Sequence, residues 1–183
     1  MKLYPLPSQE YLQECLYYNF FTGILTWKIR PLRHFSDIGK MNRWNGAWAG
    51  KTAGSMHSKG YRIIHIDKRG YYKHRIVYKL VTGFSPDELL DHRNGIVCDD
   101  RLLNLRESTN AQNLCNRGAQ RNNKTGLKGA WRHSMRNGKW WYQAQITKNG
   151  KKFVLGVFET AEEAHQAYAS AASATHGEFA KVS

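Results

Sequence analysis

Four polar residues have the types and the spacing needed for chemistry on a phosphodiester. Asp91 and His92 are adjacent in LDHRNG (90–95), Asn104 opens NLR (104–106), and Asn113 closes TNAQN (109–113). A carboxylate, an imidazole and two amides brought to one point can hold one divalent metal ion and one activated water. Oxygen donors suit Mg²⁺ or Mn²⁺, whereas a zinc site would favour Cys and His ligands. We therefore predict one Mg²⁺ or Mn²⁺ ion per site.

The charge of the chain points to a polyanionic partner. The 183 residues carry a formal net charge of +14 and a pI near 9.8. Between Asn110 and Phe153 there is no Asp or Glu, although ten Lys and Arg residues fall there. Positive side chains this close in sequence repel one another unless a polyanion neutralises them, so we expect nucleic-acid contact. No apolar run has transmembrane length and the N-terminus lacks a signal-peptide core, so we expect no membrane partner and a cytoplasmic location.

The elements around the four residues are expected to bring them together. Asp91 and His92 end an extended segment, the polar loop 93–100 reverses the chain, and 103–106 returns beside it. Thr109 and Gln112 form a capping box, which starts a helix that carries Asn113 in its first turn. Strand, loop, strand and helix thus place the four side chains around one point.

This segment resembles the HNH nuclease family, particularly the homing endonucleases of phages and introns, over about residues 60–117. The resemblance implies a ββα-metal fold. It implies that His92 is the general base and that Asp91 and Asn113 are the metal ligands. It also implies that the Asn104 amide orients the His92 ring. The sequence departs from many relatives at Asp100, where they carry Asn, so we expect altered hydrogen bonding in that loop. His74, in a His-Arg-aliphatic run that relatives share, is a candidate accessory residue.

The C-terminal part has the pattern of a small sheet with one helix. Three strand-like runs, 127–133, 139–148 and 151–158, are separated by Asn137-Gly138 and Asn149-Gly150, and Asn-Gly is a strong hairpin signal. Thr160 and Glu163 form a second capping box before an alanine-rich helix. We therefore predict a three-stranded antiparallel sheet plus one helix.

These C-terminal residues resemble the Apetala-two/ethylene-response-factor DNA-binding domain over essentially 123–181. The resemblance implies that the sheet face enters the major groove of duplex DNA. The residues assigned to DNA contact by position are Lys128, Trp131, Arg132, Arg136, Trp141, Gln143, Gln145, Lys151 and Lys152. Because strand side chains alternate, only about half of the strand residues can face the groove, so some of these assignments must be wrong.

Together the patterns predict an α+β protein. The expected regions are 1–55, which contacts DNA or supports the nuclease core; 56–117, the HNH domain; 118–125, a basic linker; and 126–183, the DNA-binding domain. The leading hypothesis is a site-specific, metal-dependent HNH homing endonuclease of phage type that nicks one strand of duplex DNA in the host cytoplasm, with no obligate protein partner. The alternatives are a DNA-binding regulator with an inactive nuclease site and an RNA-binding protein that stacks bases on its aromatic residues.

Overall fold

The computed structural model describes residues 4–58 and 60–182 and divides the chain into two compact units, Met1–Glu107 and Ser108–Ser183. Both units contain helices and strands, which agrees with the predicted α+β class. The division falls ahead of residues 118–125, the predicted linker. Within those residues, Asn123 donates from Nδ2 to the carbonyls of Leu127 and Ala130, so this end of the segment is tied into the second unit. No helix within 4–58 or 60–182 has the length and apolar character to cross a bilayer.

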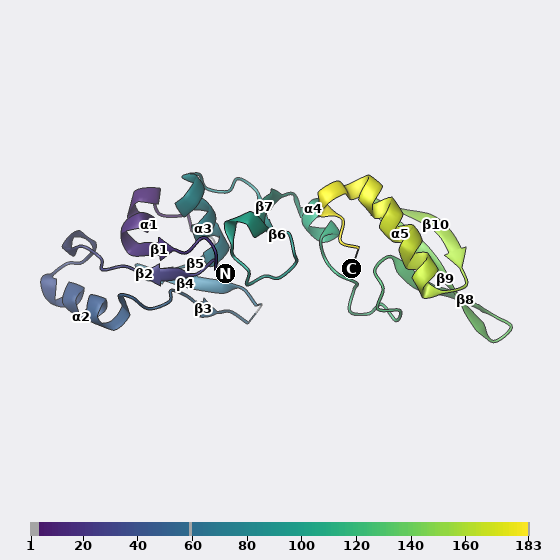
Figure 1. Ribbon diagram of the computed structural model, residues 1–183, viewed down its shortest axis with the longest axis horizontal. Helices are drawn as coiled ribbons and strands as arrows, with labels where there is room; N and C mark the ends of the chain where they lie inside the picture. The colour runs from purple at the N-terminus through teal and green to yellow at the C-terminus, as the bar shows by residue number, and fades with distance from the viewer. Residues whose placement is uncertain (1–3, 59, 183) are drawn as a thin grey trace. The chain divides into compact units, whose positions relative to one another are not determined.

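The first unit is built from short helices and small antiparallel sheets (Figure 1). Its elements are α1 (Gln9–Cys15), β1 (Leu16–Tyr18), β2 (Leu25–Trp27), the 3-10 turn η1 (Leu32–His34), α2 (Ile38–Trp48), β3 (Ser55–Met56), β4 (Arg62–Ile66), β5 (Arg69–Tyr72), α3 (Lys73–Thr82), β6 (Leu89–His92), the 3-10 turn η2 (Leu102–Asn104) and β7 (Leu105–Ser108), whose last residue belongs to the second unit.

The core of the first unit forms where α1 and α3 pack on the central hairpin. Leu12 of α1, Ile64 of β4 and Ile76 and Val77 of α3 are fully buried in one apolar cluster. Strand-like residues 61–66 and 71–75 on either side of Lys68-Arg69-Gly70 predict a hairpin. It is present as β4 and β5, joined at Asp67 and Lys68, which both have positive φ. Burial of apolar side chains from segments distant in sequence is what holds this unit together.

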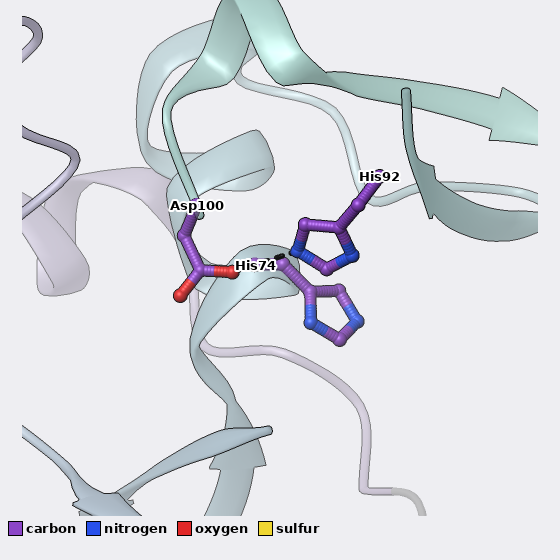
Figure 2. Close-up of side chains that lie close together, drawn as sticks. All are labelled: His74, His92 and Asp100. Carbon is purple, nitrogen blue, oxygen red and sulfur yellow. Dashed lines mark hydrogen bonds and ion pairs between the residues drawn. The ribbon is translucent and has the colours of Figure 1, made fainter. Parts of the chain in front are cut away.

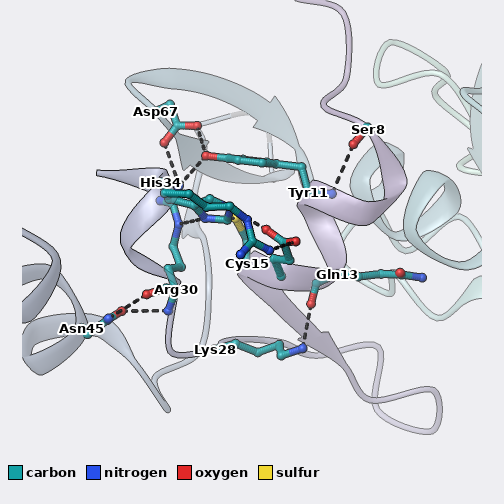
Figure 3. A network of polar contacts seen from close by, with 11 residues as sticks. Ser8, Tyr11, Gln13, Cys15, Lys28, Arg30, His34, Asn45 and Asp67 are labelled. Atoms are coloured by element: carbon teal, nitrogen blue, oxygen red, sulfur yellow. Dashed lines mark hydrogen bonds and ion pairs between the residues drawn. The ribbon is translucent and has the colours of Figure 1, made fainter. Parts of the chain in front are cut away.

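A buried arginine ties the hairpin turn to the N-terminal helix (Figure 3). Arg30 is only 3% exposed, and its Nη2 donates to Asp67 Oδ1 at 2.9 Å and to Tyr11 Oη at 2.6 Å. Its Nε donates to His34 Nδ1 at 3.1 Å. The guanidinium also lies 5.0 Å from the ring centroid of Trp44 on α2. A buried charge requires such partners, so Arg30 fixes η1 and α2 against α1.

Helix α3 begins earlier than the apolar spacing predicts. The spacing of the apolar residues in 76–81 predicts a helix that begins at Ile76, after a strand through residue 75, and stops at Gly83. In the structure α3 starts at Lys73, so His74 lies on a helix. Tyr72 occupies the N-cap without a side-chain hydrogen bond, which left no capping signal to read in the sequence. The predicted end is confirmed: Gly83 caps α3 in the left-handed conformation, with φ 83°.

The second unit has the predicted three-stranded sheet and helix, although its first strand runs over 130–136 and not over the predicted 127–133 (Figure 1). Its elements are α4 (Asn110–Cys115), β8 (Ala130–Arg136), β9 (Lys139–Lys148), β10 (Lys151–Phe158), α5 (Ala161–His176) and the 3-10 turn η3 (Gly177–Phe179). The strands are antiparallel in the order β10-β9-β8. Asn137 and Asn149 have positive φ in the two predicted hairpin turns, and both predicted capping boxes, before α4 and α5, are formed.

Candidate active site

Asp91 and His92 are the last two residues of β6, beside the returning strand β7. Asp91 is 6% and His92 4% exposed, so both side chains are almost fully buried. Neighbouring side chains of a strand point to opposite sides. The carboxylate and the imidazole therefore have different partners.

Asp91 is paired with Arg106 of β7. Both Nε and Nη2 of Arg106 donate to Asp91 Oδ2, at 3.0 and 2.9 Å. Arg106 is 7% exposed, so this is a buried ion pair that links the two strands. The sequence did not single out Arg106, although it stands in the Asn-Leu-Arg run beside Asn104. The pair fixes the carboxylate next to His92.

His92 is paired with Asp100, which comes from the loop between β6 and η2 (Figure 2). His92 Nε2 lies 3.0 Å from Asp100 Oδ1, and Lys73 Nζ at the start of α3 lies 3.2 Å from Asp100 Oδ2. Burial would raise the pKa of the Asp100 carboxyl. The hydrogen bond with His92 and the charge of Lys73 outweigh burial, so its pKa lies below the usual range. A charged group thus sits in the interior against the predicted general base.

His74 lies against His92 in an aromatic environment. Its ring stacks on Tyr72 with centroids 5.4 Å apart and meets the His92 ring edge-on, also at 5.4 Å. Burial, aided by the nearby His92, lowers the pKa of His74 to about 4, so its ring is neutral near pH 7. Its Nδ1 is buried and has no hydrogen-bond partner. The structure therefore places this candidate accessory residue beside His92, the predicted general base.

The Asn104 amide makes a different set of contacts from the one predicted. Its Oδ1 accepts from the Asn94 backbone N–H at 3.0 Å. Its Nδ2 donates to the side-chain Oδ1 of Asn94 at 3.0 Å and to the Asp99 backbone carbonyl at 2.8 Å. The amide thus braces the loop that follows His92. Any effect of Asn104 on the His92 ring would act through that loop, so its role in catalysis stays a prediction.

Asn113 lies on α4, in the second compact unit, whereas Asp91, His92 and Asn104 lie in the first. The capping box places its backbone as predicted: Thr109 Oγ1 accepts from the Gln112 amide, and Gln112 Oε1 accepts from the Thr109 amide. The convergence of Asn113 with the other three residues stays a prediction.

The comparison with family models bears directly on this segment. The model described as HNH endonuclease matches residues 71–115. The match supports an HNH endonuclease domain at these residues. The match contains all five predicted site residues: His74, Asp91, His92, Asn104 and Asn113. No curated protein and no solved structure matches the chain, so the C-terminal resemblance stays a prediction.

Two groups of donors for a metal ion fall within residues 71–115, one predicted from the sequence and one brought together by the structure. A carboxylate oxygen of Asp91 and the amide oxygen of Asn113 are hard donors that fit Mg²⁺ or Mn²⁺ by their chemistry. A second group joins His74, His92 and Asp100, whose ligand atoms lie within 4.8 Å of one another. Two imidazoles and one carboxylate are donors of the zinc type. Because Lys73 already balances the Asp100 charge, this second group is better described as the surroundings of His92.

Outside the HNH domain, strand register sorts the predicted DNA contacts by face. Ala130 and Ala144 are paired, fully buried and packed under Ala164 of α5, so their side of the sheet faces the helix. The residues paired on the opposite, open face include Trp131 with Gln143 and Gln145 with Val154. By alternation, six predicted contacts share this open face: Trp131, Arg136, Trp141, Gln143, Gln145 and Lys152.

The other three predicted DNA contacts lie elsewhere. Lys128 precedes β8, is half-buried, and donates from Nζ to the carbonyl of Cys115. Arg132 is on the helix side, with its guanidinium 5.3 Å from the Trp140 ring centroid. Lys151 pairs with Lys148 at the turn, again on the helix side by alternation. A sheet that meets DNA through its open face would not use these three side chains.

Proposed function

We propose that this protein is a site-specific, metal-dependent DNA endonuclease of the homing type. The observation that carries the proposal is the buried Asp91-His92 pair at the end of β6, inside the segment that matches the HNH endonuclease model. Each residue has its own fixed partner, Arg106 for the carboxylate and Asp100 for the imidazole. Preorganised groups of this kind are what a hydrolytic site requires.

His92 supplies the base in the proposed reaction. Its imidazole takes one proton from a water molecule as the water oxygen bonds to phosphorus. The bond from phosphorus to the 3′ oxygen then breaks and that oxygen takes a proton from solvent, which leaves a 5′ phosphate and a 3′ hydroxyl. His92 returns to its neutral form by releasing its proton to solvent. Asp91 and Asn113 would hold a divalent ion. That ion, when bound, stabilises the negative charge on the phosphate and on the leaving oxygen.

The second unit would deliver this site to duplex DNA. Its open sheet face carries two tryptophans, two glutamines, Arg136 and Lys152, and no acidic residue lies between Asn110 and Phe153. Positive charge attracts the phosphate backbone, while Arg and Gln can read guanine and adenine edges in the major groove. A single HNH domain per chain favours nicking of one strand.

The test uses the full chain and a library of supercoiled plasmids with random inserts. In Mg²⁺, wild type should convert a subset of plasmids to open circles, and sequencing should map the nicks to one recurring site. Chelation of the metal should abolish nicking. The His92→Ala variant should lose it as well, whereas His65→Ala should retain it, because His65 is exposed on β4 and outside the site.

Two outcomes would overturn the proposal. If His92→Ala nicks as fast as wild type, the catalytic assignment is wrong. If wild type binds duplex DNA at stated salt but never cleaves it with Mg²⁺ or Mn²⁺, the protein is a DNA-binding regulator with an inactive site. Tighter binding to single-stranded RNA than to duplex DNA at the same salt would favour the RNA-binding alternative.

A further inference from the structure

Asp100 is a buried carboxylate held between two basic side chains. It is 2% exposed, Oδ1 faces His92 Nε2 at 3.0 Å, and Oδ2 faces Lys73 Nζ at 3.2 Å. Lys73 is itself only 5% exposed. The three residues come from the first turn of α3, the end of β6 and the loop before η2, so the fold brings together groups that are distant in sequence. A buried ammonium and a buried carboxylate persist in such a place only when they are paired.

The charge on Asp100 decides which nitrogen of His92 carries the proton. An ionised carboxylate can only accept hydrogen bonds, so the short contact requires a proton on Nε2 of His92. In the neutral ring, Nδ1 then carries the lone pair. Lys73 favours the ionised form of Asp100 and so prevents the carboxyl from acting as a donor. The pair therefore selects one tautomer.

We propose that Asp100, held by Lys73, is a positioning residue that fixes the His92 ring with its proton on Nε2 and its basic lone pair on Nδ1. The catalytic part of this inference rests on the proposed nuclease function. The tautomer itself does not, since it follows from the contact alone. Asp100 touches neither substrate nor metal in this account and acts through His92.

The N-terminal β1–β2 hairpin contacts the loop that carries Asp100. The Tyr18 hydroxyl on β1 accepts a hydrogen bond from the Leu102 backbone amide at 2.8 Å. The same hydroxyl donates to the Asp100 carbonyl oxygen at 3.4 Å. At Gly23, in the β1–β2 turn, an added Cβ would lie 2.8 Å from the Arg101 nitrogen. The hairpin is therefore pressed against the backbone that carries Asp100. Through this contact the N-terminal region helps to hold the loop of Asp100 in place.

The tautomer is read directly by long-range ¹H–¹⁵N spectra of the histidine rings in the full chain at about pH 8.5, where an ordinary imidazole is neutral. In wild type, the His92 signals should report a proton on Nε2. Asp100→Ala should shift the ring toward a mixture of tautomers. Asp100→Asn should move the proton toward Nδ1, because Lys73 can only donate and draws the amide oxygen, which turns the amide NH2, a donor, toward Nε2.

Cleavage kinetics give the second readout. Asp100→Ala should lower kcat about 100-fold, since general-base catalysis is worth about 10²–10⁴-fold. KM for DNA should change less than about threefold, because ground-state binding is not touched. Asp100→Asn should also lower kcat, because the ring then carries its proton on Nδ1 and offers no basic lone pair there. The matched control is Asp99→Ala: Asp99 is in the same loop but pairs with Arg101 and Asn94, so its kcat should stay near wild type.

The proposal is overturned if His92 in wild type carries its proton on Nδ1. It is also overturned if Asp100→Ala leaves the tautomer and kcat unchanged, or if Asp99→Ala loses as much activity. If Asp100→Ala does not fold, Asp100→Asn still decides, since a proton that stays on Nε2 in that variant contradicts the idea. If wild type does not cleave DNA at all, the nuclease function fails while the spectra still test the positioning by Asp100.

Discussion

Replacement of Arg106 by Met should destabilise the first unit by about 3–5 kcal/mol, the usual cost of removing one partner from a buried ion pair. The structure supports the upper part of this scale. Both Arg106 contacts to Asp91 are at most 3.0 Å long, and both residues are almost fully buried. Two unit charges about 4 Å apart interact by about 4 kcal/mol at an effective dielectric constant near 20. Arg106→Met loses this attraction and leaves the Asp91 carboxylate buried without its ion-pair partner Arg106.

The assay is hydrogen exchange of the core amides of β4 and α3, followed in the full chain with increasing urea. These amides report the first unit alone, which matters because the two units need not unfold together. Arg101→Met is the matched control. Arg101 also pairs with an aspartate, Asp99, but its side chain is 51% exposed, and solvent screens the contact. Its stability should stay close to that of wild type.

A double variant separates charge burial from packing. Asp91→Leu combined with Arg106→Met removes both charges and should recover most of the lost stability, since apolar replacements of buried pairs are often neutral or better. The double variant should nevertheless fail to cleave DNA, because the proposed metal ligand is gone. The reasoning is refuted if Arg106→Met is as stable as Arg101→Met, or if the double variant is less stable than the single one.

Three further predictions concern stability. Burial lowers the pKa of His74 to about 4 in the folded chain, whereas an unfolded chain protonates this ring below about pH 6.5. Because the unfolded state then binds one more proton, the free energy of unfolding should fall by about 3 kcal/mol as pH drops from 6.5 to 4. A urea-midpoint profile of His74→Phe should lack this part of the slope, and an identical slope would contradict the burial argument. Gly129→Ala should cost about 3 kcal/mol or more, because φ is 79° and the new Cβ would lie 2.0 Å from Tyr168 Cγ. Gly138→Ala has a similar φ but open space, so thermal unfolding should show a clearly smaller loss. Thr160→Ala should destabilise α5 by about 1 kcal/mol through loss of the cap, and unchanged exchange rates in its first turn would argue against the capping box.

The parts of the fold that the sequence predicts are those with local causes. Asn-Gly pairs determine hairpin turns through positive φ, and capping boxes mark helix starts, so β8–β10, α4 and α5 could be located before the structure was known. The start of α3 could not, since Tyr72 offers no capping side chain. Alternation implied that the predicted DNA contacts could not all share one face of the sheet, but the register was needed to show that Arg132 and Lys151 lie on the helix side.

The partners of the site residues were beyond sequence reasoning for a different reason. Asp91 meets Arg106 and His92 meets Asp100 only because β6, the loop and β7 fold back on themselves. Lys73 reaches Asp100 from α3. Such contacts follow from tertiary packing and leave no period or spacing in the chain. Motif residues could therefore be named from the sequence, whereas the groups that hold them could not.

The central claim, that His92 is the base of a phosphodiester hydrolase, is tested most directly by one rate. The measurement is single-turnover cleavage of a mapped target site in Mg²⁺ at saturating protein, for wild type and for His92→Ala. We predict a fall of about 10²–10⁴-fold in the variant, with DNA affinity at the same salt unchanged. Equal cleavage rates for the two proteins would contradict the account.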